Sequence, residues 1–189
     1  MKPWLVEDFI RPLDDTDPEM KAYLEQIHTG GGCPTMPRAR CRDAFQPYAD
    51  GGERLARYLV HHIEASHAEG YPRASHYLTL LAYTRSETGF QYLSALADEW
   101  EPGAPAYVLS GIQALGKTGD ERALDSMLRL LAEEGPDSRA HAHALLGVFR
   151  LLDDTGSRRA DAVHALRRLR KNERFGDYVA REMSVLGIE

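Results

Sequence analysis

The segment Gly111-Ile-Gln-Ala-Leu-Gly116-Lys117-Thr118 carries the residue types that could hold a nucleotide. It matches the pattern G-x-x-x-x-G-K-[ST], in which backbone N–H groups surround the phosphates while the lysine and the hydroxyl reach phosphate and magnesium. That chemistry needs a preceding strand and a parallel sheet. Here the four intervening residues continue a helical pattern, and no other strand is evident in the sequence. We therefore interpret Gly116 and Gly119 as residues that end a helix, and we expect no bound nucleotide.

Histidine and cysteine side chains raise the question of a metal site. His61 and His62 lie on one predicted helix, and His62 could approach His76 if the two helices pack together. Cys33 and Cys41 are separated by seven residues, which is not zinc-finger spacing. A site that joins the cysteine segment to the histidine helix stays open geometrically, but no motif supports it. We expect no metal ligands and no cofactor.

The sequence offers no arrangement for nucleophilic catalysis. It contains no G-x-S-x-G motif, and neither cysteine has flanking residues that would favour a reactive thiolate. The chain also contains no His-Glu pair, which repeat-containing iron hydroxylases use. We therefore expect no catalytic residues and no enzyme activity.

The elements that must position any functional residue are predicted to be helices. Apolar residues recur at helical spacing along most of the chain, with Gly, Pro and Asp at the interruptions. Asp120 is a good N-cap for one of these helices. The predicted helices cover residues 4–10, 17–28, 38–48, 51–69, 74–84, 86–100, 106–115, 121–131, 137–152, 158–171 and 175–186.

The helices recur in pairs. Three apolar patterns in second helices can be superposed, namely Tyr92-Leu93-x-x-Leu96, Ala123-Leu124-x-x-Met127 and Ala162-Val163-x-x-Leu166. Their spacings are 31 and 39 residues. Repetition of helix pairs at such a period is typical of an α-solenoid, in which each pair buries one face against its neighbours. The fold class predicted is therefore all-α, and the architecture an α-solenoid.

The segment Ala114-Leu-Gly-Lys-Thr-Gly-Asp-Glu-Arg-Ala-Leu124 resembles HEAT-like repeats, in particular the short bacterial type that also occurs in phycobilisome lyases. The resemblance implies a right-handed superhelix of helix pairs whose second helices line a concave binding face. We assign residues 71–172 to HEAT-like repeats and residues 173–189 to a C-terminal capping helix. Residues 1–70 form a helical cap or degenerate repeats, with a Gly-rich loop at 29–37.

The charges are unevenly distributed. The 189 residues carry a net charge of −6, which argues against a surface built throughout for nucleic acid. Residues 1–25 are mainly acidic, whereas residues 158–174 hold seven arginine and lysine residues against Asp161 and Glu173. The longest apolar run is too short to cross a membrane, and Glu7 and Asp8 interrupt any signal-peptide core. We expect a cytoplasmic protein with no membrane partner.

These patterns favour non-catalytic recognition of a protein partner whose identity stays open. An immunity or antitoxin-type role and an adaptor role are two versions of it. The alternative is an enzyme on the same scaffold, either nucleic-acid modifying or similar to a bilin lyase. The mixed charges of the second helices argue against a nucleic-acid duplex, and Arg122, Arg129 and Arg168 are expected to share the binding face. The complete predicted partner surface comprises Gln91, Ser94, Arg122, Asp125, Arg129, Asp161, His164 and Arg168.

Overall fold

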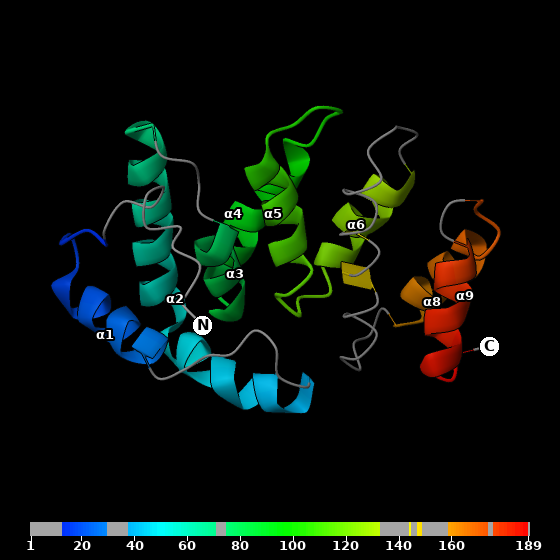
Figure 1. The fold of residues 1–189 in the computed structure, drawn as a ribbon, viewed down its shortest axis with the longest axis horizontal. Coiled ribbons are helices and arrows are strands. Elements are labelled where there is room, and N and C mark those ends of the chain that lie inside the picture. The colour runs from blue at the N-terminus through cyan, green and yellow to red at the C-terminus, as the bar shows by residue number, and fades with distance from the viewer. Residues whose placement is uncertain are drawn as a thin grey trace, which may run out of the picture.

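The computed structural model describes residues 13–29, 38–70, 75–132, 144, 147–148, 159–173 and 176–188, with only the backbone for 38–44. Within these residues the protein contains eight helices and no strand (Figure 1). The predicted helices 4–10 and 137–152 and the loop 29–37 fall largely outside this part. The helices are α1 (Pro18–Thr29), α2 (Arg38–Ala68), α3 (Ser75–Tyr83), α4 (Glu87–Asp98), α5 (Ala106–Leu115), α6 (Ala123–Ala132), α8 (Arg159–Leu169) and α9 (Gly176–Val185).

Helix α2 consists of two helical segments. Gly52 interrupts it with φ 49° and ψ −140°, a conformation that glycine adopts because it has no Cβ. The sequence predicts two helices here, over 38–48 and 51–69, and both are present on either side of the interruption. Tyr23 of α1 attaches to the first segment, because its hydroxyl donates to the carbonyl oxygen of Pro47 at 2.5 Å.

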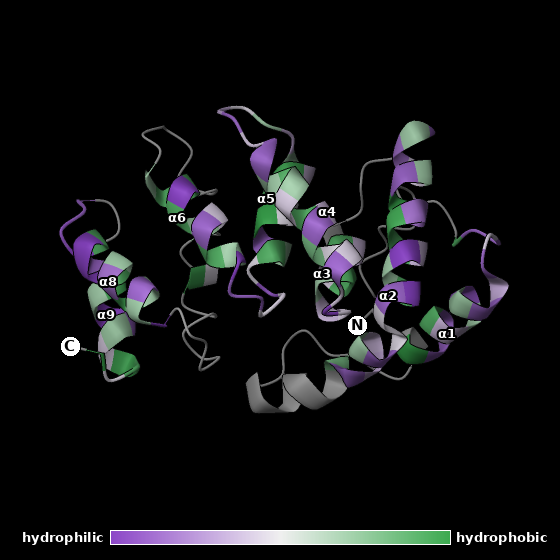
Figure 2. Ribbon diagram, turned by 180° about the vertical axis from the view of Figure 1, so that it is seen from behind, coloured by the Kyte–Doolittle hydropathy of each residue, from purple (hydrophilic) through white to green (hydrophobic). Residues whose placement is uncertain are grey.

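Helices that are two apart in the chain lie beside one another. α2 packs against α4 and α4 against α6, while α3 packs against α5. α4 and α5 also make the most extensive helix–helix contact of the described part. Apolar residues fill these contacts, as Figure 2 illustrates with hydrophobic colour between helices and hydrophilic colour outside. Leu59, Leu81, Leu93 and Ile112 are fully buried there.

The turn between the two helices of a pair occurs twice with the same hydrogen bond. The hydroxyl of Thr84 donates to the carbonyl oxygen of Leu81 at 2.7 Å, and the hydroxyl of Thr118 donates to that of Leu115 at 2.8 Å. The residue after each threonine has a positive φ, 49° at Arg85 and 73° at Gly119. The two turns are therefore equivalent at an offset of 34 residues.

The buried positions of the second helices agree with this offset. Gly89, Leu93 and Leu96 of α4 correspond to Ala123, Met127 and Leu130 of α6, and all six are buried. The predicted spacing of 31 residues between these helices is therefore wrong. It pairs apolar residues one helical turn out of register, because positions three apart lie on the same face of a helix.

Candidate interaction surface

The phosphate-loop pattern does not form a phosphate loop. Its first five residues lie inside α5, and Gly116 ends that helix in a right-handed helical conformation. The ammonium of Lys117 donates to the Thr79 hydroxyl at 3.0 Å, and the Thr118 hydroxyl donates to the Leu115 carbonyl. Both groups that would bind a nucleotide are thus used in helix contacts, which agrees with the interpretation of Gly116 as a helix end.

Two of the histidines contact a buried aspartate. Oδ2 of Asp14 lies 3.8 Å from Nε2 of His61 and 3.5 Å from Nδ1 of His62. Burial raises the pKa of Asp14, but hydrogen bonds from Thr16 and the charges of the two histidines lower it further, so that the pKa lies below its usual value. These contacts attach the residues before α1 to α2.

His62 and His76 approach a common neighbour, as the sequence suggested they could. Their rings lie 4.9 and 4.0 Å from the ring of Tyr77, and burial raises the pKa of Tyr77 to about 12. Within the described residues no group of three or more His, Cys, Asp or Glu side chains has metal-binding geometry. The side chains of Cys33 and Cys41 lie outside the described part.

The predicted partner surface lies on α4, on α6 with the turn before it, and on α8. Its members are exposed, with the exception of Ser94, which is half-buried. In the register of the structure, Thr88, Gln91 and Ala95 of α4 correspond to Arg122, Asp125 and Arg129. The prediction of Ser94 is therefore displaced by one position, and Ala95 is the exposed residue that sequence reasoning missed. An alanine gives no chemical signal, and only the spacing of the turns identifies it.

Arg122 bridges α4 and the turn before α6. Its guanidinium donates to Glu87 at 3.1 and 2.7 Å and to Asp120 at 2.6 to 3.1 Å, and it lies 4.0 Å above the ring centroid of Phe90. These hydrogen bonds hold the pKa values of Glu87 and Asp120 below their usual range.

A second arginine repeats the bridge at the other end of the same two helices. Arg129 of α6 pairs with Asp98 of α4 at 2.5 Å. Arg168 on α8 makes no ion pair within the described residues. The three arginines therefore differ, since two of them connect helices and the third projects from the surface.

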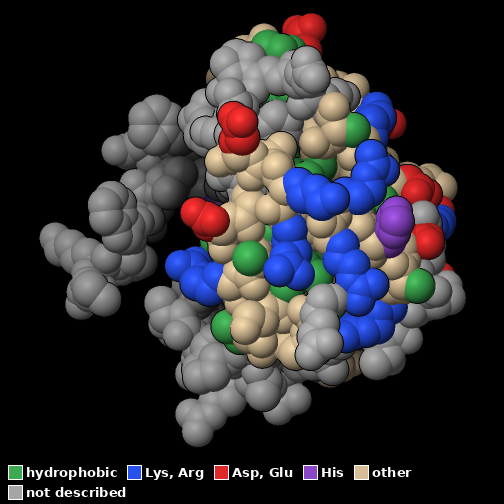
Figure 3. Space-filling model, turned by 90° about the vertical axis from the view of Figure 1, so that its right-hand side faces the viewer, with side chains coloured by type: hydrophobic (Ala, Val, Ile, Leu, Met, Phe, Trp, Pro, Cys, Tyr) green, Lys and Arg blue, Asp and Glu red, His purple; other side chains and the backbone are tan. Residues whose placement is uncertain are grey.

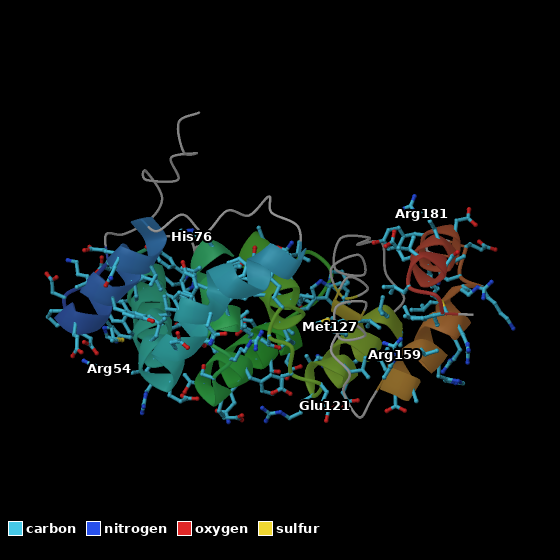
Figure 4. The ribbon with its side chains drawn as sticks, turned by 90° about the horizontal axis from the view of Figure 1, so that it is seen from below. Arg54, His76, Glu121, Met127, Arg159 and Arg181 are labelled. Carbon is cyan, nitrogen blue, oxygen red and sulfur yellow. The ribbon has the colours of Figure 1, made fainter. Side chains whose placement is uncertain are left out.

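The contact between α2 and α4 has a polar edge of the same kind. The carboxylate of Glu53 accepts hydrogen bonds from the backbone N–H and the hydroxyl of Thr88 at 3.2 and 2.7 Å. The hydroxyl of Tyr92 donates to Glu64. A row of polar bridges thus runs from α2 across α4 to α6. Figure 4 shows Arg54 and Glu121 on this side of the molecule and His76 on the opposite side.

The aromatic residues of α4 do not stand out from this surface. Trp100 is buried, with 9% of its surface exposed, and Tyr92 is half-buried against Glu64. The exposed side chains between the bridges are instead polar or small, as at Gln91, Ala95 and Asp125.

No helix in the described part combines the length and the apolar composition that crossing a membrane requires. Comparison with known proteins gives no similar molecule for this chain: no protein-family model, no curated protein and no solved structure matches it.

Proposed function

We propose that this protein binds another protein, without catalysis, on the surface formed by its second helices α4, α6 and α8. The proposal includes a HEAT-like helical repeat, in which the 34-residue recurrence of the turn marks one repeat. Its main support is the row of bridges from Glu53 to Arg122 and Arg129, because this row fixes neighbouring second helices into one polar surface. A fixed surface loses little conformational freedom when a partner binds to it.

The side chains on this surface suit a protein partner. Gln91, Asp125 and Arg129 are exposed, of mixed charge and borne by regular helices. Arginine is enriched at protein interfaces and forms planar paired hydrogen bonds with carboxylates. Immunity, antitoxin-type and adaptor roles are all forms of this activity, and the partner's identity decides between them.

The test places a bulky side chain on the proposed surface at a position without a structural role. Ala95 is exposed on α4 and corresponds to Arg129. In Ala95→Arg the new side chain would project into the partner. Proteins captured from the native lysate by the unmodified chain and identified by mass spectrometry should be lost by at least about tenfold, the effect of roughly 1.4 kcal/mol of binding free energy.

The matched control is Ala106→Arg, which makes the same change at an exposed helical position of α5, outside the second helices. It should retain the captured protein, and both variants should keep the melting temperature of the parent chain. The proposal is wrong if no protein is captured specifically, or if Ala95→Arg captures it as well as Ala106→Arg does.

A further inference from the structure

The C-terminal end of the molecule carries a basic surface. Figure 3 views this end and shows arginine and lysine side chains spread across it, with few acidic ones between them. The exposed cations of α8, α9 and the residues that follow α8 form what we term the basic end surface. Its members are Arg159, Arg167, Arg168, Arg170, Lys171 and Arg181.

Several of these cations are not used within the protein. Arg168, Arg170 and Lys171 form no ion pair in the described part of the chain, in contrast to Arg54, Arg122 and Arg129, which each contact a carboxylate. The acidic residues of the same end are Asp161, Glu173, Asp177 and Glu182, the last of which lies 3.5 Å from Arg181.

The helix dipole accounts for only part of this cluster. Cations in the last turn of a helix interact favourably with its carbonyl end, which applies to Arg167 and Arg168 of α8. Arg170 and Lys171 lie beyond the last helical residue, and Arg159 lies in the first turn, where a cation is unfavourable. Holding these like charges together costs free energy that an anionic partner would recover.

The charge of the remaining chain limits the size of that partner. Residues 159–188 hold seven arginine and lysine residues and four acidic ones, which leaves 16 and 25 elsewhere and a net charge of −9 there. A long polyanion, such as a duplex or an anionic membrane, would extend beyond the basic end surface and be repelled by the rest of the molecule. A short acidic segment would contact the cations alone.

We infer that the basic end surface binds a short acidic segment of the partner protein, whose carboxylates pair with Arg168, Arg170 and Lys171. This inference rests on the proposed function and names the chemistry of the partner. Arginine suits it because the guanidinium and the carboxylate form two parallel hydrogen bonds. The α4–α6 surface provides the remaining contact area, and the acidic segment orients the partner and accelerates its association.

The inference is tested by fluorescence anisotropy with a labelled glutamate-rich decapeptide. The full chain should bind it, and binding should weaken at high salt because exposed charges are screened. In Arg168→Glu combined with Lys171→Glu, the dissociation constant should rise at least about tenfold, since the substitutions replace attraction by repulsion. A Gln pair at the same positions should give a smaller loss and serves if the Glu pair does not fold.

The control makes the same change of charge elsewhere. Arg57 and Arg85 are exposed outside the basic end surface, and Arg57→Glu combined with Arg85→Glu should leave peptide binding within about twofold of the parent chain. The inference is overturned if the peptide does not bind, if both pairs weaken it equally, or if single-stranded DNA of equal charge or phosphatidylserine vesicles bind more tightly. Retained loss of the captured protein in Ala95→Arg would then leave the proposed function standing.

Discussion

Gly116 shows how a single missing side chain can set the distance between helices. Its φ of −65° is available to any residue, so backbone freedom is not the reason for glycine here. A Cβ built at this position would lie 2.6 Å from the Cα of Gly147, and a Cβ on Gly147 would lie 3.2 Å from the Cα of Gly116. The two backbones therefore approach so closely that neither position has room for a methyl group.

Gly116→Ala should destabilise the protein by about 1–3 kcal/mol, because the backbone must move to relieve the overlap. Without that contact the substitution would be neutral or favourable, since alanine restricts the unfolded chain. Urea unfolding measures the difference. Gly103→Ala separates the two effects, because Gly103 has a φ of 93° and open space around it. A destabilisation smaller at Gly116 than at Gly103 would contradict the packing argument.

The sequence predicts many of these residue roles. Gly116 at a helix end and the helical setting of Lys117 follow from the apolar pattern around them, and both are confirmed. The predicted core of the same region is confirmed for Leu124, whereas Leu128 is only half-buried. Apolar spacing defines a face of a helix, but the edge of that face depends on the neighbouring helix, which the sequence does not provide.

At the scale of elements, the sequence predicts the helices and misplaces the repeat. Positions 89, 93 and 96 and positions 92, 93 and 96 give similar apolar patterns, and only the equivalent turns at Thr84 and Thr118 distinguish them. A signal was present, because Thr-Gly-Asp at 118–120 resembles Thr-Arg-Ser at 84–86 and Thr-Gly-Ser at 155–157. The last of these lies outside the described part. Arg85 conceals the likeness, since a positive φ suggests glycine.

The bridge between α4 and α6 should be visible in the response to acid. Arg122 is the leading cause of the lowered pKa values of Glu87 and Asp120. Each carboxyl therefore stabilises the folded state above its unfolded pKa, near 4.5 and 3.8, and this contribution disappears as the pH falls through the lower folded value. Acid should thus weaken the contact between the two helices.

Replacing Arg122 by glutamine should bring both pKa values back toward their usual range and flatten the loss of stability below pH 4.5. At neutral pH the change should be small, because the bridge is exposed and screened. Urea midpoints measured from neutral pH to about pH 2.5 test the stability, and carboxyl NMR titration of Glu87 tests the cause. An Arg57→Gln variant provides the control, and equal slopes for Arg122→Gln and the parent would refute the assignment.

At the scale of the whole molecule, the two ends differ in charge and the helices differ in how they are supported. α4 packs on α2, α3, α5 and α6, whereas α1 packs chiefly on α2 and α9 chiefly on α8 within the described part. The row of bridges strengthens the middle of the molecule, and the cations of the basic end surface repel one another at its end. Stability should therefore decrease from the centre toward both ends.

Amide hydrogen exchange followed by mass spectrometry should show this gradient, with α3, α4 and α5 exchanging most slowly and α1 and α9 fastest. Exchange reports local opening free energies, which are highest where buried contacts are most extensive. In an array where each helix pair contacts only its neighbours, damage also stays local. Leu93→Ala removes a fully buried side chain of α4 and should cost about 2–5 kcal/mol. It should accelerate exchange in α2 to α6 much more than in α8 and α9, because the C-terminal pair opens independently of α4. Equal acceleration in every helix would mean that the chain unfolds as one cooperative unit.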